Sequence, residues 1–223
     1  MHVGHFAAGF IAKRVEPKLS LGTLVLAAML PDFLWCIFMI LGIEHVRFHD
    51  ARGAVNYFEP NDIALSHSLL MTIVWAVVFA GLHYFRRRLI RSAAVLFALV
   101  STHWVLDVVA HRPDMPLAPG LAARFGLGLW GNIPATIIVE GGFWLVAIIV
   151  YVRSTYSKKK FGNFIFWIGI VLITLIGYNN IAGPPPPNPK TAPIASFVYF
   201  SLVVAWAYWM NRLRPARNEN VAR

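Results

Sequence analysis

Five ionisable residues lie inside long apolar stretches of the sequence, where such side chains are rare. They are Asp32, His67, His103, Asp107 and Glu140. An ionisable group in an apolar medium is costly, so it normally faces the protein interior, has a partner there and marks a functional site. Imidazole and carboxylate groups bind divalent cations, and a set with nitrogen and oxygen but no sulfur favours zinc over manganese or iron. We therefore predict a buried metal site.

Three of the candidate ligands follow one another at intervals of four residues: His103, Asp107 and His111. On a helix this spacing advances by only ~40° per step, so the three side chains share one narrow stripe. Such a stripe can bind one cation or two neighbouring cations. The alternative is that Asp–His pairs only join helices through hydrogen bonds. For five ionisable residues on four helices, we favour the metal site.

The segment from Met1 to Ala12 adds His2 and His5. It is too short to span a bilayer, but a half-inserted helix would raise His5 by about 12 Å from Lys13, towards the other candidates. The alternative is a disordered amphipathic start. We expect His5 rather than His2 to be the ligand, although the sequence leaves both open.

The composition indicates which elements must position these residues. The chain has 223 residues, of which 58% are hydrophobic and only 13% are charged. This balance indicates a bilayer environment. The single cysteine, Cys36, excludes an intramolecular disulfide framework and a cysteine-rich zinc module. Six apolar runs are each long enough to span a bilayer as a helix: Leu21 to Ile43, Ile63 to Phe85, Ser92 to Ala110, Ile133 to Val152, Gly162 to Ile181 and Pro193 to Met210.

We therefore predict an all-α integral membrane bundle of about six transmembrane helices with a short half-inserted N-terminal helix. Residues 1–152 are expected to form the helical core that carries the metal site. Residues 153–223 are expected to supply two scaffold helices and a basic cytoplasmic tail.

The formal charge of +10 follows from the way in which a membrane protein distributes its basic residues between the two sides of the bilayer. Most of the 20 lysine and arginine residues fall on one side if both termini are cytoplasmic, as the positive-inside rule requires. The basic residues form short clusters beside the spans and no stripe with interleaved aromatics, so we expect no nucleic-acid partner. Measured from the nearest cytoplasmic basic residue, Asp32, His103 and Glu140 share a depth of ~18–21 Å, which places the cluster in the outer half of the membrane.

The loop after the first run contains two more histidines with metal-like spacing, His45 and His49, beside Glu44 and Asp50. A loop exposes its polar side chains to water, so we interpret these four residues as solvated loop residues. The alternative is that they cover the mouth of the site.

The order of the motifs resembles that of a known family. His5 is followed by Leu30-Pro31-Asp32, then by Ser66-His67-Ser68-Leu69-Leu70, and then by Ser101-Thr102-His103 with Asp107. Over about the first 150 residues the chain resembles the YdjM-like family of inner-membrane, metal-dependent hydrolases, which is similar in ligand order to zinc-dependent phospholipase C. The resemblance implies a polymetal site with His5, Asp32, His67, His103 and Asp107 as ligands. His111 and Glu140 would hold an adjacent ion, and a one-metal site or an inactive relative is left open.

The expected function is hydrolysis by metal-activated water, with Asp32 or Glu140 taking the proton. The membrane position indicates a phosphoester or lipid-linked substrate, and the family resemblance implies a place in the bacterial inner membrane. Two alternatives use the same residues. A transporter would pass protons or metal ions along the cluster, and a noncatalytic membrane scaffold would use it only to join helices.

Overall fold

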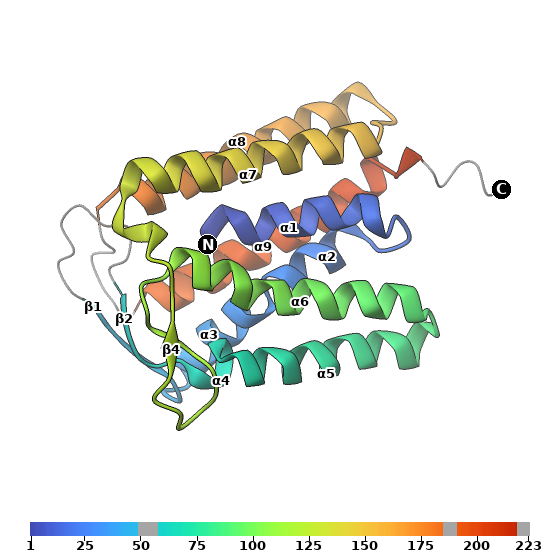
Figure 1. Ribbon diagram of the computed structural model, residues 1–223. Coiled ribbons are helices and arrows are strands. Elements are labelled where there is room, and N and C mark those ends of the chain that lie inside the picture. Colours follow the sequence, from blue (N-terminus) through green and yellow to red (C-terminus); the bar gives the residue numbers. More distant parts are fainter. Residues whose placement is uncertain (49–57, 185–190, 218–223) are drawn as a thin grey trace.

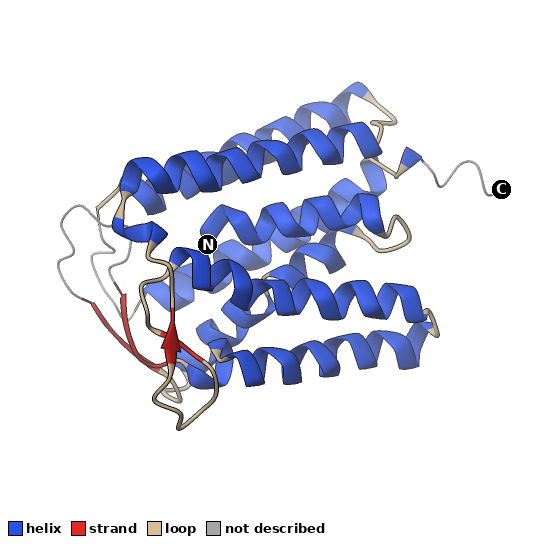
Figure 2. Cartoon of the chain, viewed as in Figure 1, coloured by secondary structure: helices blue, strands red, loops and turns tan. Residues whose placement is uncertain are grey.

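Helices dominate the computed structural model, which describes residues 1–48, 58–184 and 191–217 (Figures 1 and 2). The α-helices are α1 (His2–Val15), α2 (Leu21–Ala28), α3 (Leu30–Ile40), α4 (Ala64–His67), α5 (Leu69–Arg87), α6 (Ile90–Ala110), α7 (Ile133–Ser154), α8 (Lys160–Ala182) and α9 (Ala192–Leu213). A short 3₁₀ helix covers Leu129–Gly131. Two antiparallel pairs join β1 (His45–Phe48) to β2 (Phe58–Asp62) and β3 (Met115–Pro116) to β4 (Arg124–Phe125). The predicted all-α class is confirmed.

Five helices, α5 to α9, are each long and apolar enough to cross a membrane. The pair of α2 and α3 passes the same test together, so the bundle has up to six spans in the part of the chain that the structure describes. Many apolar side chains on these helices are exposed in the isolated chain, as expected for surfaces that face lipid. The prediction of about six transmembrane helices is confirmed.

Two of the predicted runs are interrupted. The run from Leu21 to Ile43 bends by 59° between α2 and α3, at Met29. Pro31 has no N–H group, so it cannot complete the helical hydrogen bond to the residue four positions earlier. The run from Ile63 to Phe85 is interrupted at Ser68, which has an extended backbone and accepts a hydrogen bond from the N–H of Met71, capping α5.

Helix α1 lies inside the bundle, where it packs against α2, α6, α7 and α8 (Figure 1). Its face with Phe6, Ala7 and Phe10 is fully buried. A Cβ atom at Gly9 would lie 3.1 Å from the Cα atom of Val25, so glycine lets α1 approach α2 closely. The N-terminal segment is therefore an ordered core helix, and the alternative of a disordered start is wrong for this structure.

The two ends of the bundle differ in character. The connections from α5 to α6 and from α7 to α8 lie at one end, together with the C-terminal ends of α1 and α9 (Figure 1). These connections carry the basic clusters of the sequence. The strands lie at the opposite end, which is also where α1 begins (Figure 1). Met1 is buried at that end, away from the basic clusters, and the cytoplasmic position of the termini stays a prediction.

Candidate metal centre

His103 and Asp107 form the centre of the polar cluster. They lie one helical turn apart on α6, and both side chains are buried. Nδ1 of His103 donates a hydrogen bond to the carbonyl oxygen of Ala28 over 2.7 Å, because a carbonyl can only accept. This bond leaves the lone pair of Nε2 available. That atom lies 3.1 Å from Oδ2 of Asp107 but is not aligned for a hydrogen bond.

The break between α2 and α3 supplies two parts of this arrangement. Ala28 is the last residue of α2, and its carbonyl oxygen fixes the ring of His103. Asp32 lies in the first turn of α3, with Oδ1 3.8 Å from Nε2 of His103. The side chain of Asp32 is 21% exposed against 3% for Asp107, so Asp32 is the more accessible of the two carboxylates.

His67 completes a set of four candidate ligand atoms. Its Nε2 atom lies 3.4 Å from Oδ1 of Asp32 and 3.9 Å from Oδ2 of Asp107. The four distances between an imidazole nitrogen and a carboxylate oxygen therefore range from 3.1 to 3.9 Å. In a tetrahedral zinc site with bonds of ~2.0–2.1 Å, ligand atoms lie ~3.3–3.4 Å apart. The four nitrogen–oxygen distances bracket this value, and Asp32, His67 and His103 form one group of three ligand atoms that lie within 4.8 Å of one another.

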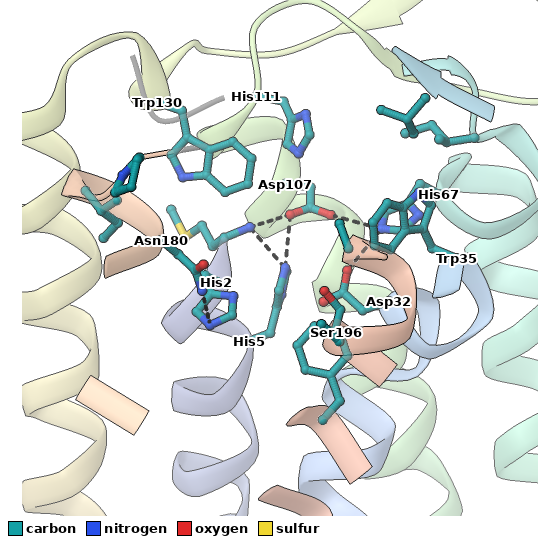
Figure 3. Close-up of a pocket in the computed structure, with 18 residues that line it drawn as sticks. His2, His5, Asp32, Trp35, His67, Asp107, His111, Trp130, Asn180 and Ser196 are labelled. Atoms are coloured by element: carbon teal, nitrogen blue, oxygen red, sulfur yellow. Dashed lines mark hydrogen bonds and ion pairs between the residues drawn. The ribbon is translucent and has the colours of Figure 1, made fainter. Parts of the chain in front are cut away.

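A second group of three candidate ligands shares His103 and Asp107 and adds His5 of α1. Nε2 of His5 lies 3.0 Å from Oδ1 of Asp107, so the two oxygens of this carboxylate face different histidines (Figure 3). The rings of His5 and His103 stack with their centroids 3.6 Å apart. The α-ammonium group of Met1 donates to Oδ1 of Asp107 over 2.5 Å. Asp107 is thus placed to serve two neighbouring sites.

A hydrogen-bonded chain behind His67 was missed in the sequence. Ser66 donates to Glu44 twice, from its backbone N–H to Oε1 over 2.8 Å and from its hydroxyl to Oε2 over 2.6 Å. The hydroxyl oxygen lies 2.7 Å from Nδ1 of His67 and accepts a hydrogen bond from it, because the hydroxyl donates its own hydrogen to Glu44. Nε2 of His67 is therefore left to face Asp32 with a free lone pair.

The interpretation of Glu44 as a solvated loop residue is wrong, because the residue is only 1% exposed. Burial raises the pKa of its carboxyl group, and the hydrogen bonds from Ser66 oppose that shift. The signal in the sequence was the position of an acidic residue directly after an apolar run. Of its three loop neighbours, His45 is exposed, and His49 and Asp50 lie outside the described residues.

His111 belongs to neither candidate group among the described residues. Helix α6 ends at Ala110, and His111 has an extended backbone with ψ of 151°. The helix ends here because Pro113 follows two residues later and disfavours helical geometry at Arg112. The stripe predicted for His103, Asp107 and His111 therefore stops before its last member. Nδ1 of His111 instead lies 3.0 Å from Oδ1 of Asp114.

Glu140 of α7 also lies outside both candidate groups in the described chain. Its Oε1 atom accepts a hydrogen bond of 2.7 Å from Nε1 of Trp130. Its Oε2 atom is buried without a hydrogen-bond partner among the described residues. The structure thus brings together five of the seven predicted ligands: His5, Asp32, His67, His103 and Asp107.

The cluster opens into a cavity of about 320 Å³ (Figure 3). Five of the seven predicted ligands reach its wall: His5, Asp32, His67, Asp107 and His111. Apolar residues form most of the remaining wall, including Trp35, Ile63, Ile181 and Phe200. Helices α8 and α9, predicted as scaffold, contribute Asn180, Ile181, Ala192, Ala195, Ser196 and Phe200. Within the described ranges, neither lysine nor arginine lines this cavity. The two carboxylates, Asp32 and Asp107, therefore face one ammonium group and several imidazoles but no lysine or arginine side chain of the described residues, a balance that favours an additional cation.

A family model described as YdjM inner membrane protein matches residues 1–183. The match extends beyond the first 150 residues over which the sequence motifs indicated this family. It includes all the candidate ligands and α8, which forms part of the cavity wall. No curated protein and no solved structure matches the chain. The similarity in ligand order to zinc-dependent phospholipase C stays a prediction.

Proposed function

The chain belongs to the YdjM inner membrane protein family, and we propose that it is a membrane-embedded, metal-dependent hydrolase. The observation that carries this proposal is the convergence of two imidazoles and two carboxylates. Nε2 of His67 and Nε2 of His103 each lie 3.1–3.9 Å from an oxygen of Asp32 and an oxygen of Asp107, distances that bracket the separation of ligand atoms around tetrahedral zinc. His5 and the second oxygen of Asp107 would contribute to an adjacent ion.

The environment of the imidazoles supports this assignment. His103 is held by a backbone carbonyl and His67 by the hydroxyl of Ser66, so both rings turn Nε2 towards the carboxylates. Hydrogen bonds of this kind on the far nitrogen are typical of histidines that bind metals. A divalent cation at this position supplies Lewis-acid chemistry, which polarises a phosphoryl or carbonyl oxygen and acidifies water.

Asp32 is the proposed proton acceptor. It is the more exposed carboxylate of the set and lies on the cavity wall, where water and substrate can reach it. Glu140, the other candidate from the sequence, does not line the cavity, and its Oε1 atom is held by Trp130. We assign Glu140 an electrostatic role near the α-ammonium group of Met1.

The cavity supports a substrate with both a polar and an apolar part. The candidate ligands supply the polar part of its lining, and apolar residues of α3, α8 and α9 supply much of the rest. A lipid or lipid-linked phosphoester has this character, with a phosphate group for the metal centre and an acyl or isoprenoid chain for the apolar wall. We propose this substrate class, an inner-membrane location and a cytoplasmic basic end.

A hydrolysis assay tests the proposal. The detergent-purified chain is loaded with zinc and given a panel of lipid phosphoesters, and the release of phosphate or headgroup is measured. We expect turnover that falls by at least about 100-fold in Asp32→Asn, because both ligation and proton transfer are impaired. Asp114→Asn, the same change outside the cluster, should retain turnover. Absence of zinc-dependent turnover over the whole panel would contradict the proposal.

One observation favours the alternative of a transporter. Discontinuous helices commonly form ion sites in transporters, and the pair of α2 and α3 is bent by 59° at the site. Beyond the cluster, however, α2, α5 and α6 pack through Leu24, Ala27, Ala76, Leu96 and Val100 towards the basic end. An apolar core of this kind offers no relay for an ion. Zinc flux in proteoliposomes would be the result that supports transport over hydrolysis.

A further inference from the structure

A second hollow, of about 200 Å³, lies at the basic end of the bundle. Three segments far apart in sequence form it: the end of α1 with the turn after it, the end of α7, and the residues after α9. The lining residues are Lys13, Arg14, Pro17, Arg153, Ser154, Ala216 and Arg217. Four of these residues are basic, and within the described part of the chain the lining includes no acidic residue. The hollow is therefore strongly cationic.

Backbone hydrogen bonds fix the segment after α9 against the end of α7. Thr155 and Ala216 form an antiparallel β-bridge, and the N–H of Tyr156 donates to the carbonyl oxygen of Pro215 over 3.2 Å. Nε of Arg217 donates to the carbonyl oxygen of Thr155 over 3.1 Å. The fold thus places the side chain of Arg217 beside Arg153 through ordered contacts.

The four basic residues differ in how they are used. Lys13 is buried, and its Nζ donates to the carbonyl oxygens of Pro17 and Leu19, which stabilises the turn after α1. Arg14 and Arg153 are exposed, and their guanidinium groups have no hydrogen-bond or ion-pair partner among residues 1–48, 58–184 and 191–217. Elsewhere at this end of the bundle, Arg91 pairs with Glu16 over 3.2 Å.

Like charges gathered in a small hollow repel one another, and an anion between them removes that repulsion. Guanidinium groups bind phosphate oxygens through pairs of parallel hydrogen bonds. Basic pockets between helices at the cytoplasmic end of membrane proteins bind phosphate-bearing lipid headgroups. We propose that this hollow is a phosphate-binding site in which Arg14, Arg153 and Arg217 hold the phosphate group of an anionic lipid headgroup or a free phosphate ion.

This site lies at the opposite end of the bundle from the metal centre and does not depend on the proposed hydrolase activity. Its residues come from helix ends, where a basic side chain can also serve only to interact with the negative end of a helix dipole. In that case the basic residues would bind no phosphate in preference to other anions. A binding experiment separates the two interpretations.

The experiment uses the detergent-purified full chain and native mass spectrometry, with dioleoyl phosphatidylglycerol as the lipid and dioleoyl phosphatidylcholine for comparison. The test variant is R14Q/R153Q. The matched control is R86Q/R87Q, which removes the same charge from the last turn of α5 and leaves the hollow intact. We expect phosphatidylglycerol binding to weaken by at least about tenfold in the test variant and by less than about twofold in the control.

Inorganic phosphate, added as a competitor, distinguishes a site for free phosphate from a site for the lipid headgroup. Displacement of the lipid by millimolar phosphate identifies a site for the phosphate group itself, and resistance to it identifies a site for the lipid headgroup; both results support the proposal. Equal weakening in the two double variants, or none in either, would overturn it. If R14Q/R153Q elutes as an aggregate, the single variant R153Q, at an exposed side chain, is compared with R87Q in the same way.

Discussion

Nε2 of His67 lies 3.4 Å from Oδ1 of Asp32, and each of these residues adjoins a break in a helix. Asp32 follows the break at Met29, and His67 precedes the break at Ser68. The groups that orient the two imidazole rings also lie beside these breaks. The carbonyl oxygen of Ala28, at the first break, accepts a hydrogen bond from His103, and the hydroxyl of Ser66, near the second, contacts His67. The interrupted helices therefore supply both ligands and the hydrogen bonds that aim the rings.

The first prediction concerns Glu44, which acts on the metal centre only through Ser66. In Glu44→Gln an amide NH₂ replaces the oxygen that accepts from the hydroxyl of Ser66. The hydroxyl of Ser66 then has no carboxylate oxygen to donate to, so the arrangement in which it accepts a hydrogen bond from Nδ1 of His67 is lost. We expect zinc affinity, measured by competition with a chelating dye, to fall by about 10- to 100-fold although all the ligands remain.

Glu16→Gln is the control for this change, because Glu16 is also buried and lies at the end of α1 far from the metal centre. Its zinc affinity should equal that of the unmodified chain. Unchanged affinity in Glu44→Gln would show that Ser66 and Glu44 do not position His67.

The second prediction separates His111 from His67. Because His111 lies beyond the end of α6 and contacts Asp114, His111→Ala should retain bound zinc within about twofold. His67→Ala removes one of four converging ligand atoms and should lose most of the metal. Zinc content after gel filtration is the measurement. Loss of zinc from His111→Ala would mean that the loop after α6 closes over the centre when the ion binds.

The third prediction is that a chelator destabilises the chain. A cation held between α3, α4 and α6 binds the folded state and stabilises it, by about 2.7 kcal/mol when its concentration is 100 times its dissociation constant. EDTA should therefore lower the temperature of thermal unfolding in detergent, and added zinc should restore it. His103→Ala should unfold at the same temperature with and without EDTA. If EDTA lowered the unfolding temperature of this variant as much as that of the unmodified chain, the stabilising ion would lie elsewhere.

The fourth prediction concerns orientation. In a Cys36→Ala background, Lys159→Cys reports on the turn before α8, and Leu127→Cys reports on the exposed loop before α7 at the end with the metal centre. A membrane-impermeant maleimide added to intact cells should label Leu127→Cys alone, because the positive-inside rule predicts a cytoplasmic basic end. Labelling of Lys159→Cys without cell lysis would reverse the orientation.

The sequence was sufficient to predict the all-α membrane bundle, because long apolar runs in lipid have few structural options. It also identified Asp32, His67, His103 and Asp107, since ionisable side chains inside such runs are costly and require partners, whereas His5 came from the short N-terminal segment. Asp107 illustrates this: both its helix and its inward orientation follow from its spacing with His103.

The parts that the sequence did not reveal depend on local interruptions and on distant contacts. The helical stripe extends to His111 only if α6 continues past Ala110, and Pro113 prevents this. Glu44 is distant from Ser66 in sequence, and no local pattern indicates that a loop folds back onto a short helix. Met1 reaches Asp107 because α1 packs in the middle of the bundle, which only the tertiary structure shows.

The metal content of the purified chain tests the central claim most directly. Protein prepared in detergent, incubated with zinc and freed of excess metal is analysed by inductively coupled plasma mass spectrometry, beside His103→Ala, Asp107→Ala and the control Asp114→Ala. The account predicts at least one zinc ion per chain in the unmodified protein and in Asp114→Ala, and a loss from both His103→Ala and Asp107→Ala. No retained metal in the unmodified protein, or equal retention in all four, would contradict it.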